Sequence, residues 1–265
     1  MIGAIAGDII GSVHECVGGV GGKDRDFEFF PVMFDDTTFT DDSVLTVATA
    51  DVLLNPGYSY ADAYRDYFKR YPNRGYGGSF SHWGAGHTQG PYNSWGNGSA
   101  MRVSPVSWVA TDISEALRMA KQSAKVTHNH PEGIKGAQAV AVAGYMARKG
   151  YSPERIRGAI AGKFGYNMDR SVNDIRPGYR FDVSCQGSVP EAIICALESV
   201  SWEGAVRSAV SLGGDTDTQA CMAGGIAEAM FGPVPQEIRD KVHEKLPDDL
   251  WRVVTAFEAR YMGGA

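Results

Sequence analysis

One stretch late in the chain limits the possible folds more than any other. Gly213-Gly214-Asp215-Thr216-Asp217-Thr218 follows an apolar segment and leads into residues 219–232, where small residues lie on almost every side. A helix that is apolar all round is normally buried. The two glycines permit a tight turn before it, and the positive end of a helix favours carboxylates there. The sequence therefore predicts a buried helix with two carboxylates at its entrance.

The two carboxylates of this turn have two interpretations. Asp215 and Asp217, together with neighbouring hydroxyls, offer the oxygen ligands that hard divalent cations prefer. The alternative is that one of them simply caps the helix. A cap explains one acid, and the paired arrangement after two glycines favours a metal site.

A second acidic cluster lies near the other end of the chain. Thr40-Asp41-Asp42 precedes a helix whose apolar side chains include Val44, Leu45 and Val47. Thr40 is a typical N-cap and acids suit the first turn of a helix, so capping again explains one acid better than two. Two acidic helix entrances are what a dinuclear metal site split between distant segments requires.

The first helix is expected over residues 2–12, with glycines at 3, 7 and 11. Positions four apart share one face, so another helix can approach closely along this glycine stripe. Glu15 follows, and Gly18 to Gly22 then predict a loop. Glu15 is either a ligand-binding carboxylate or an ordinary surface residue at a helix end.

Residues 74–97 are rich in Gly, Tyr, Trp, His and Ser and show no helical period. A stretch of this length is uncommon in a compact domain unless it binds something. Ser94, Trp95, Asn97 and Gly98 at its end would suit a phosphate and a stacked base. Further on, of the two histidines in Thr127-His128-Asn129-His130-Pro131, one is expected to contact a ligand and the other to act as a cap or core contact.

We expect about ten helices and no strands, and hence an all-α fold in which residues 1–265 form one domain. The irregular residues 165–184 are interpreted as an excursion, and residues 235–261 as an amphipathic helical tail.

Composition excludes several classes of protein. The net charge is −6 and no basic run exceeds Lys69-Arg70, so nucleic-acid binding is not expected. Charges or glycines interrupt every apolar stretch, so no membrane span is expected either. The beginning lacks the basic region of a signal peptide. Cys16, Cys185, Cys195 and Cys221 are scattered, which favours a reducing cytoplasm, and we expect a monomer.

Five segments in this order resemble the ADP-ribosylglycohydrolase family, and the resemblance covers nearly the whole chain. It is strongest to the bacterial branch that contains the dinitrogenase-reductase-activating glycohydrolase, which has a similar Thr-His-Asn-His-Pro run. The five segments are Gly3 to Asp8 with Glu15, Thr40-Asp41-Asp42, Gly96 to Arg102, Thr127 to Pro131, and Gly213 to Thr218.

The resemblance implies an orthogonal helical bundle that holds two Mg²⁺ or Mn²⁺ ions in a cleft. The metal ligands implied by similarity are Thr40, Asp41, Asp42, Asp215, Asp217 and Thr218, with Asp217 bridging the ions. The implied catalytic residues are Glu15, Asp42 and Asp217, of which Glu15 handles the attacking water or the ribose hydroxyls. The implied substrate contacts are Ser94, Trp95, Asn97, Gly98 and His128.

The expected activity is hydrolysis of the glycosidic bond between ADP-ribose and an acceptor, often arginine, on a protein or in a small conjugate. Such a bond breaks through a cation-like ribose, which nearby carboxylates stabilise. A phosphohydrolase acting on a nucleotide is one alternative. A non-catalytic ADP-ribose-binding module is another, although a binder needs no paired metal ligands.

Overall fold

The computed structural model describes residues 1–15, 25–27, 29 and 37–263. These residues contain fifteen helices and, as the one strand-like feature among them, an isolated antiparallel bridge between Gly96 and Ser184. The expected all-α fold is confirmed. The helices are α1 (Ile2–Gly11), α2 (Asp41–Leu54), α3 (Tyr60–Arg70), α4 (Gly78–Gly84), α5 (Gly98–Met101), α6 (Ser104–Val109), α7 (Ile113–Ala124), α8 (Pro131–Arg148), α9 (Pro153–Phe164), α10 (Val172–Ile175), α11 (Cys185–Leu197), α12 (Trp202–Val210), α13 (Thr216–Phe231), α14 (Gln236–Lys245) and α15 (Asp248–Tyr261).

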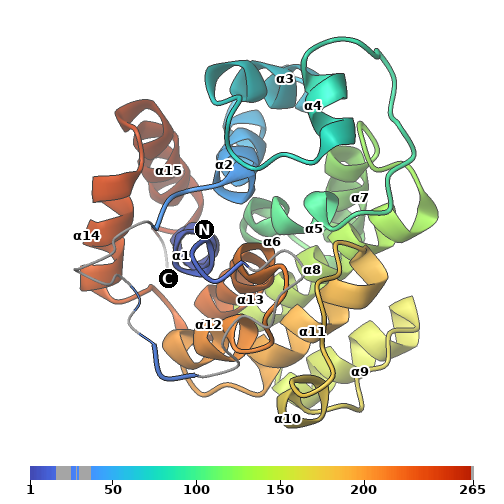
Figure 1. Ribbon diagram of the computed structural model, residues 1–265, viewed down its shortest axis with the longest axis vertical. Coiled ribbons are helices and arrows are strands. Elements are labelled where there is room, and N and C mark those ends of the chain that lie inside the picture. Colours follow the sequence, from blue (N-terminus) through green and yellow to red (C-terminus); the bar gives the residue numbers. More distant parts are fainter. Residues whose placement is uncertain (16–24, 28, 30–36, 264–265) are drawn as a thin grey trace.

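Helices α1 and α13 lie side by side near the middle of the molecule (Figure 1). The predicted glycine stripe is the reason that they can approach so closely. A Cβ atom on Gly3 would lie 2.6 Å from the carbonyl oxygen of Gly224, and one on Gly11 would lie 2.5 Å from that of Thr216. One on Gly7 would overlap the carbonyl group of Ala220. The backbones of α1 and α13 are therefore in direct contact at all three turns.

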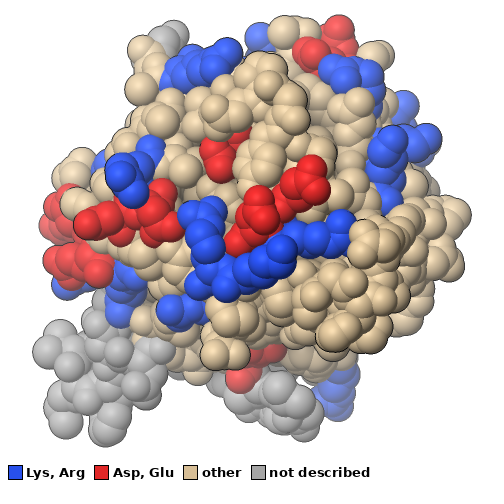
Figure 2. Space-filling model, turned by 90° about the horizontal axis from the view of Figure 1, so that it is seen from above, with Lys and Arg blue, Asp and Glu red and all other residues tan. Residues whose placement is uncertain are grey.

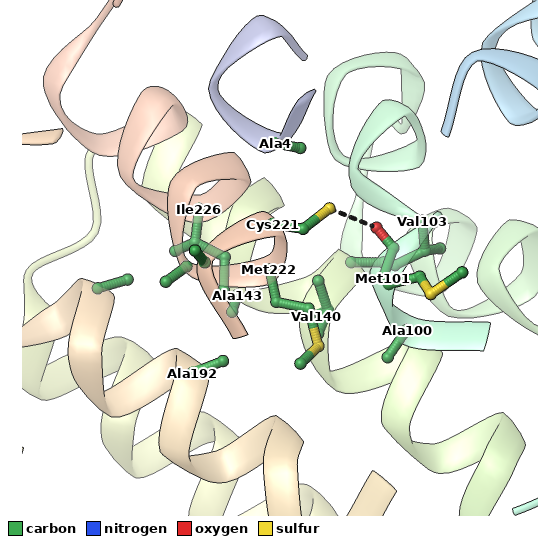
Figure 3. Packing of buried hydrophobic residues seen from close by; sticks show 14 of the residues in the cluster. Ala4, Ala100, Met101, Val103, Val140, Ala143, Ala192, Cys221, Met222 and Ile226 are labelled. Carbon is green, nitrogen blue, oxygen red and sulfur yellow. Dashed lines mark hydrogen bonds between the residues drawn. The ribbon is translucent and has the colours of Figure 1, made fainter. Parts of the chain in front are cut away.

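Helix α13 also packs against α8, α11 and α12, and almost all of its residues are buried. Small side chains such as Ala143 of α8 and Ala192 of α11 surround the larger Met222 and Ile226 of α13 (Figure 3). The thiol of Cys221 donates to the carbonyl oxygen of Met101 at 3.4 Å, which ties α13 to α5. This packing confirms that the helix is buried all round.

Two stretches that were interpreted as irregular contain a short helix. The stretch 74–97 contains α4. The surrounding sequence has no helical period, but Phe80 and Trp83 are buried against the core. The excursion at 165–184 contains the short α10 with a capping box at Ser171. The tail is helical, as predicted, and consists of two helices because the chain turns at Leu246 and Pro247.

Within the part of the chain that the structure describes, no helix combines the length and apolar character needed to cross a membrane. The loop predicted at Gly18 to Gly22 and Cys16 lie outside the described residues. The other three cysteines are free and buried.

Candidate metal and substrate site

The first acidic entrance lies at the start of α2. Thr40 is the N-cap, as predicted, and its hydroxyl oxygen accepts a hydrogen bond from the amide of Asp42 at 3.2 Å. The side chain of Asp42 is buried and that of Asp41 is half-buried. Since the cap is Thr40, neither acid is needed to cap α2.

Asp8 of α1 holds this entrance in place. Its Oδ1 accepts from the Thr40 hydroxyl at 2.6 Å, and its Oδ2 accepts from the amides of Thr40 at 2.9 Å and Ser43 at 3.0 Å. The hydroxyl of Ser43 donates to the same Oδ2. These four hydrogen bonds fix the orientation of the Asp8 carboxylate. The Thr40 hydroxyl gives its hydrogen to Asp8 and accepts from the amide of Asp42, which leaves one lone pair of its oxygen for a further partner.

The second entrance lies at the start of α13. Gly213 and Gly214 adopt positive φ angles of 74° and 79°, which other residues rarely adopt. Asp215 occupies the N-cap position, but its side chain makes no capping hydrogen bond. Its Oδ2 instead accepts from the Asn97 amide nitrogen at 2.6 Å. The capping interpretation therefore does not explain Asp215.

The fold brings the two entrances together although they are far apart in the sequence. The hydroxyl of Thr218 donates to Asp42 Oδ2 at 3.2 Å. Oxygen atoms of Asp8, Asp42 and Asp217 all lie within 4.8 Å of one another, and so do those of Glu15, Asp215 and Asp217. Six acidic or hydroxyl-bearing residues from α1, the chain after it and the two helix starts thus form one cluster.

The cluster is electrostatically unbalanced. Burial, and then the charges of neighbouring carboxylates, raise the pKa of Asp41, Asp42 and Asp217 well above its ordinary value. Burial also raises the pKa of Asp8 and Asp215, against hydrogen bonds that lower it. The pKa of Glu15 is raised by partial burial and by the charges of Asp215 and Asp8. Each shift reflects the cost of holding negative charges together away from water.

A divalent cation fits this donor set. Asp42 Oδ1 is buried and has no hydrogen-bond partner among the described residues, although a buried carboxylate oxygen normally has one. The surrounding donors are carboxylate and hydroxyl oxygens, which Mg²⁺ and Mn²⁺ prefer. A bound cation would satisfy the orphaned oxygen and offset the charge that raises the pKa values.

The cluster lines a cleft of about 600 Å³. Eleven of the twelve residues predicted for the site line this cleft: Glu15, Thr40, Asp41, Asp42, Ser94, Asn97, Gly98, His128, Asp215, Asp217 and Thr218. The twelfth, Trp95, is 48% exposed and is not among the residues lining it. Phe80, Tyr92 and Phe181 supply aromatic walls that the sequence did not single out.

One of the two histidines forms the expected cap, and the other lies in the cleft wall. His130 is the N-cap of α8 and its Nδ1 accepts from the amide of Glu132 at 3.2 Å. His128 is buried and lines the cleft. Its pKa is lowered well below the ordinary value, first by burial and then by the charge of Arg102. His128 is therefore neutral near pH 7.

Two residues of the site, Asp8 and Arg102, carried no predicted role. Both belong to short motifs that the sequence presents, Gly3 to Asp8 and Gly96 to Arg102, and both are fully buried. The signal that could have identified them is a charged residue inside a run of small and apolar residues. A charged side chain is almost never buried without a partner, so its presence in such a run indicates one.

The outer face shown in Figure 2 carries acidic and basic side chains next to one another. No broad area of this face is uniformly basic. Among the described residues, acidic side chains gather inside the cleft.

Comparisons with known proteins identify the family of the chain and its fold. The family model described as ADP-ribosylglycohydrolase matches residues 1–263. A curated relative, ADP-ribosylhydrolase ARH3 of Mus musculus, is 26% identical over 305 residues, covering 88% of this chain and 82% of the relative. An uncharacterized protein of Archaeoglobus fulgidus is 27% identical over 241 residues, covering 79% of this chain and 78% of the relative. A solved structure described as an ADP-ribosylglycohydrolase-related protein complex superposes with a TM-score of 0.71 at 22% identity, covering 98% of this chain and 97% of that one.

Proposed function

The chain belongs to the ADP-ribosylglycohydrolase family, and on this basis we propose that it is a metal-dependent hydrolase of the glycosidic bond between ADP-ribose and an acceptor. The observation that carries the proposal is the meeting of two acidic helix entrances in one cleft, where a buried oxygen of Asp42 lacks a partner. A module that only binds ADP-ribose would gain nothing from such a costly cluster.

We propose that the cluster holds two Mg²⁺ or Mn²⁺ ions. Thr40, Asp41 and Asp42 of the α2 entrance would hold one ion, and Asp215 and Thr218 of the α13 entrance the other. Asp217 would bridge them, in keeping with its place in the cluster with Asp8 and Asp42 and in the one with Glu15 and Asp215. Bound ions of this kind orient a diol and lower the pKa of water.

The side chains of the chain supply the remaining chemistry. The bond to the acceptor breaks through a cation-like ribose, and the carboxylates around the cleft stabilise that positive charge. Glu15 is the carboxylate best suited to take a proton, because its raised pKa brings its basicity nearer to neutral pH and its side chain is accessible from the cleft. Glu15 would take this proton from the attacking water or from a ribose hydroxyl.

The ADP-ribose portion would lie along the segment from Ser94 to Gly98. The amide of Gly96 donates to the Ser94 hydroxyl oxygen at 3.1 Å, which closes a tight turn beside the cleft. Asn97 faces Asp215, so this turn adjoins the acidic cluster directly. Trp95 lies outside the cleft lining, and a contact with the adenosine would have to come from its exposed side chain.

For the acceptor we propose arginine, on a protein or in a small ADP-ribose conjugate. The support is the carboxylate of Glu15 at the cleft, which is not among the proposed metal ligands and would attract a guanidinium group. We further propose that the enzyme works as a monomer in the cytoplasm, in keeping with three free, buried cysteines among the described residues.

The test is incubation with ADP-ribosyl-arginine, ADP-ribosyl-serine and O-acetyl-ADP-ribose after chelation, with and without added Mg²⁺ or Mn²⁺. We expect ADP-ribose to be released only with metal, and fastest from the arginine conjugate. Full activity after exhaustive chelation would overturn the metal site, and faster release from serine would correct the acceptor. Release of inorganic phosphate would instead identify a phosphohydrolase, and binding without any release would identify a binding module.

A further inference from the structure

A chain of hydrogen bonds in the cleft wall plays no part in the chemistry proposed above. It runs from the guanidinium of Arg102, through the hydroxyl of Thr127, to the imidazole of His128. All three residues are buried, and Arg102 and His128 line the cleft. The direction of these bonds follows from which groups can only donate.

Arg102 is a fixed donor. It is fully buried, and its Nη2 donates to the carbonyl oxygen of Ser123 at 2.9 Å and to Thr127 Oγ1 at 2.8 Å. Its guanidinium carbon lies 4.1 Å from the centre of the Tyr64 ring, which packs against its flat face. A guanidinium is always charged and has no acceptor atom. Thr127 Oγ1 is therefore an acceptor in this contact.

The single hydrogen of the Thr127 hydroxyl must then go elsewhere. The oxygen lies 2.7 Å from His128 Nδ1 and 3.5 Å from the carbonyl oxygen of Ala124, and its contact with Tyr92 is to a hydroxyl that can itself donate. The first distance is that of a good hydrogen bond and the second is at the limit of one. The hydroxyl therefore donates to Nδ1, which must be unprotonated to accept it.

A neutral imidazole with an unprotonated Nδ1 carries its hydrogen on Nε2. Burial and the charge of Arg102 keep the ring neutral by lowering its pKa. Two glycines leave room around this nitrogen: a Cβ atom on Gly98 would lie 3.2 Å from Nε2, and one on Gly96 would lie 3.7 Å from it. Among the described residues, Nε2 has no hydrogen-bond partner.

We propose that Arg102 and Thr127 are positioning residues that hold His128 as the Nε2–H tautomer, so that His128 donates a hydrogen bond to a substrate oxygen. The partner is an acceptor oxygen of the ADP-ribose portion, a ribose hydroxyl or a diphosphate oxygen, and this identification rests on the proposed function. His128 is accordingly a donor and not a proton acceptor in the free enzyme.

The tautomer is measured directly by two-dimensional NMR of protein labelled with ¹⁵N at its six histidines. We expect a single Nε2–H form for His128 at pH 7, assigned by its loss in His128→Asn. Thr127→Val removes the hydroxyl but keeps the shape, so His128 should shift towards the Nδ1–H form or a mixture. Thr127→Ser keeps the hydroxyl and should restore the parent spectrum. His130, whose Nδ1 accepts from a backbone amide, is an internal reference that neither substitution should change.

Calorimetric titration with ADP-ribose in the presence of Mg²⁺ gives the second readout. We expect Thr127→Val to weaken binding about tenfold, since one hydrogen bond to the ligand is misdirected, and Thr127→Ser to bind like the parent. An Nδ1–H form in the parent protein, or an unchanged tautomer in a folded Thr127→Val protein, would overturn the proposal. A parent protein with the expected tautomer but no affinity for ADP-ribose would overturn the proposed function while leaving the hydrogen-bond chain intact.

Discussion

At the start of α2 the acidic entrance is fastened by hydrogen bonds, whereas at the start of α13 it is fastened by backbone contact. Both fastenings come from α1. Asp8 of α1 binds the amides and hydroxyls of Thr40 and Ser43, and the glycines of α1 press against the backbone of α13. One short helix therefore fixes the distance between the two halves of the site.

The difference determines what each half tolerates. A hydrogen-bonded carboxylate can be exchanged for a side chain of the same shape, which changes the chemistry but leaves the packing intact. A glycine in backbone contact cannot accept any side chain without moving a helix. We therefore expect damage to the α2 entrance to appear in metal affinity and damage to the α13 contact to appear in stability.

The largest effect is expected from Asp42→Ala and Asp217→Ala, one in each entrance. Each should reduce turnover by at least about a hundredfold, or about 2.7 kcal/mol, because each removes a proposed metal ligand and with it part of the charge stabilisation. Asp62→Ala is the matched control, since Asp62 is a first-turn acid of α3 that is exposed. Near-parental turnover in either variant, with an unchanged unfolding midpoint, would reduce that Asp to a structural role.

Asp8→Asn should act on the α2 entrance alone. The amide nitrogen of Asn is a donor and would face donors of Thr40 or Ser43, so the Thr40 oxygen loses its orientation. Residues that orient metal ligands typically contribute about 10- to 100-fold to metal affinity, and we expect a loss of that size by calorimetry with Mn²⁺. Asp174→Asn is the control, because Asp174 accepts comparable bonds at the start of α10, away from the cleft. Unchanged affinity in Asp8→Asn would separate Asp8 from the metal site.

Gly7→Ala should break the α13 contact. The new methyl group would overlap the carbonyl group of Ala220, and neither backbone can yield without moving a helix. We expect a loss of about 1–3 kcal/mol of unfolding free energy, which corresponds to a fall in Tm of about 2–4 °C per kcal/mol. Gly162→Ala in the exposed part of α9 is the matched control, because nothing lies within 4 Å of its new Cβ atom. That control should gain up to about 1 kcal/mol from helix propensity. Equal midpoints for the two variants would contradict the close contact of α1 and α13.

Much of this arrangement could be predicted from local sequence. The acidic entrances were visible because paired carboxylates followed N-cap or glycine signals, and the glycine stripe was visible because its period matches a helix. Both are properties of neighbouring residues. The helical class followed in the same way from the spacing of apolar residues.

What could not be predicted depends on contacts between distant segments. The role of Asp8 exists only because α1 meets the start of α2, and that of Arg102 only because Thr127 lies against it. Helix α4 forms because Phe80 and Trp83 pack into the core, and no helical spacing of apolar residues in the surrounding sequence indicated this helix. The capping alternative for Asp215 could be dismissed only once its Asn97 partner was seen.

The smallest effect, and the one that treats both entrances together, is the pH dependence of stabilisation by metal. Raised pKa values of Asp41, Asp42 and Asp217 mean that protons compete with the cation closer to neutral pH than for ordinary carboxylates. The stabilisation is therefore fully present above these raised pKa values and is lost as the pH falls through them. Each tenfold loss of affinity removes about 1.4 kcal/mol under saturating metal, or roughly 3–6 °C of Tm.

The measurement is the difference in Tm with and without Mg²⁺ between pH 8 and pH 5.5. Taking the difference matters because His128 also reduces stability as the pH falls, independently of metal. Its pKa is lowered in the folded protein, so its contribution to stability is lost as the pH falls through the ordinary histidine value, with or without metal. We expect the difference to shrink steadily towards pH 5.5 in the parent protein and to be absent throughout in an Asp42→Ala, Asp217→Ala double variant. A difference that stays constant over this range would mean that the carboxylates bind metal without proton competition, and the raised pKa values would then not describe the site.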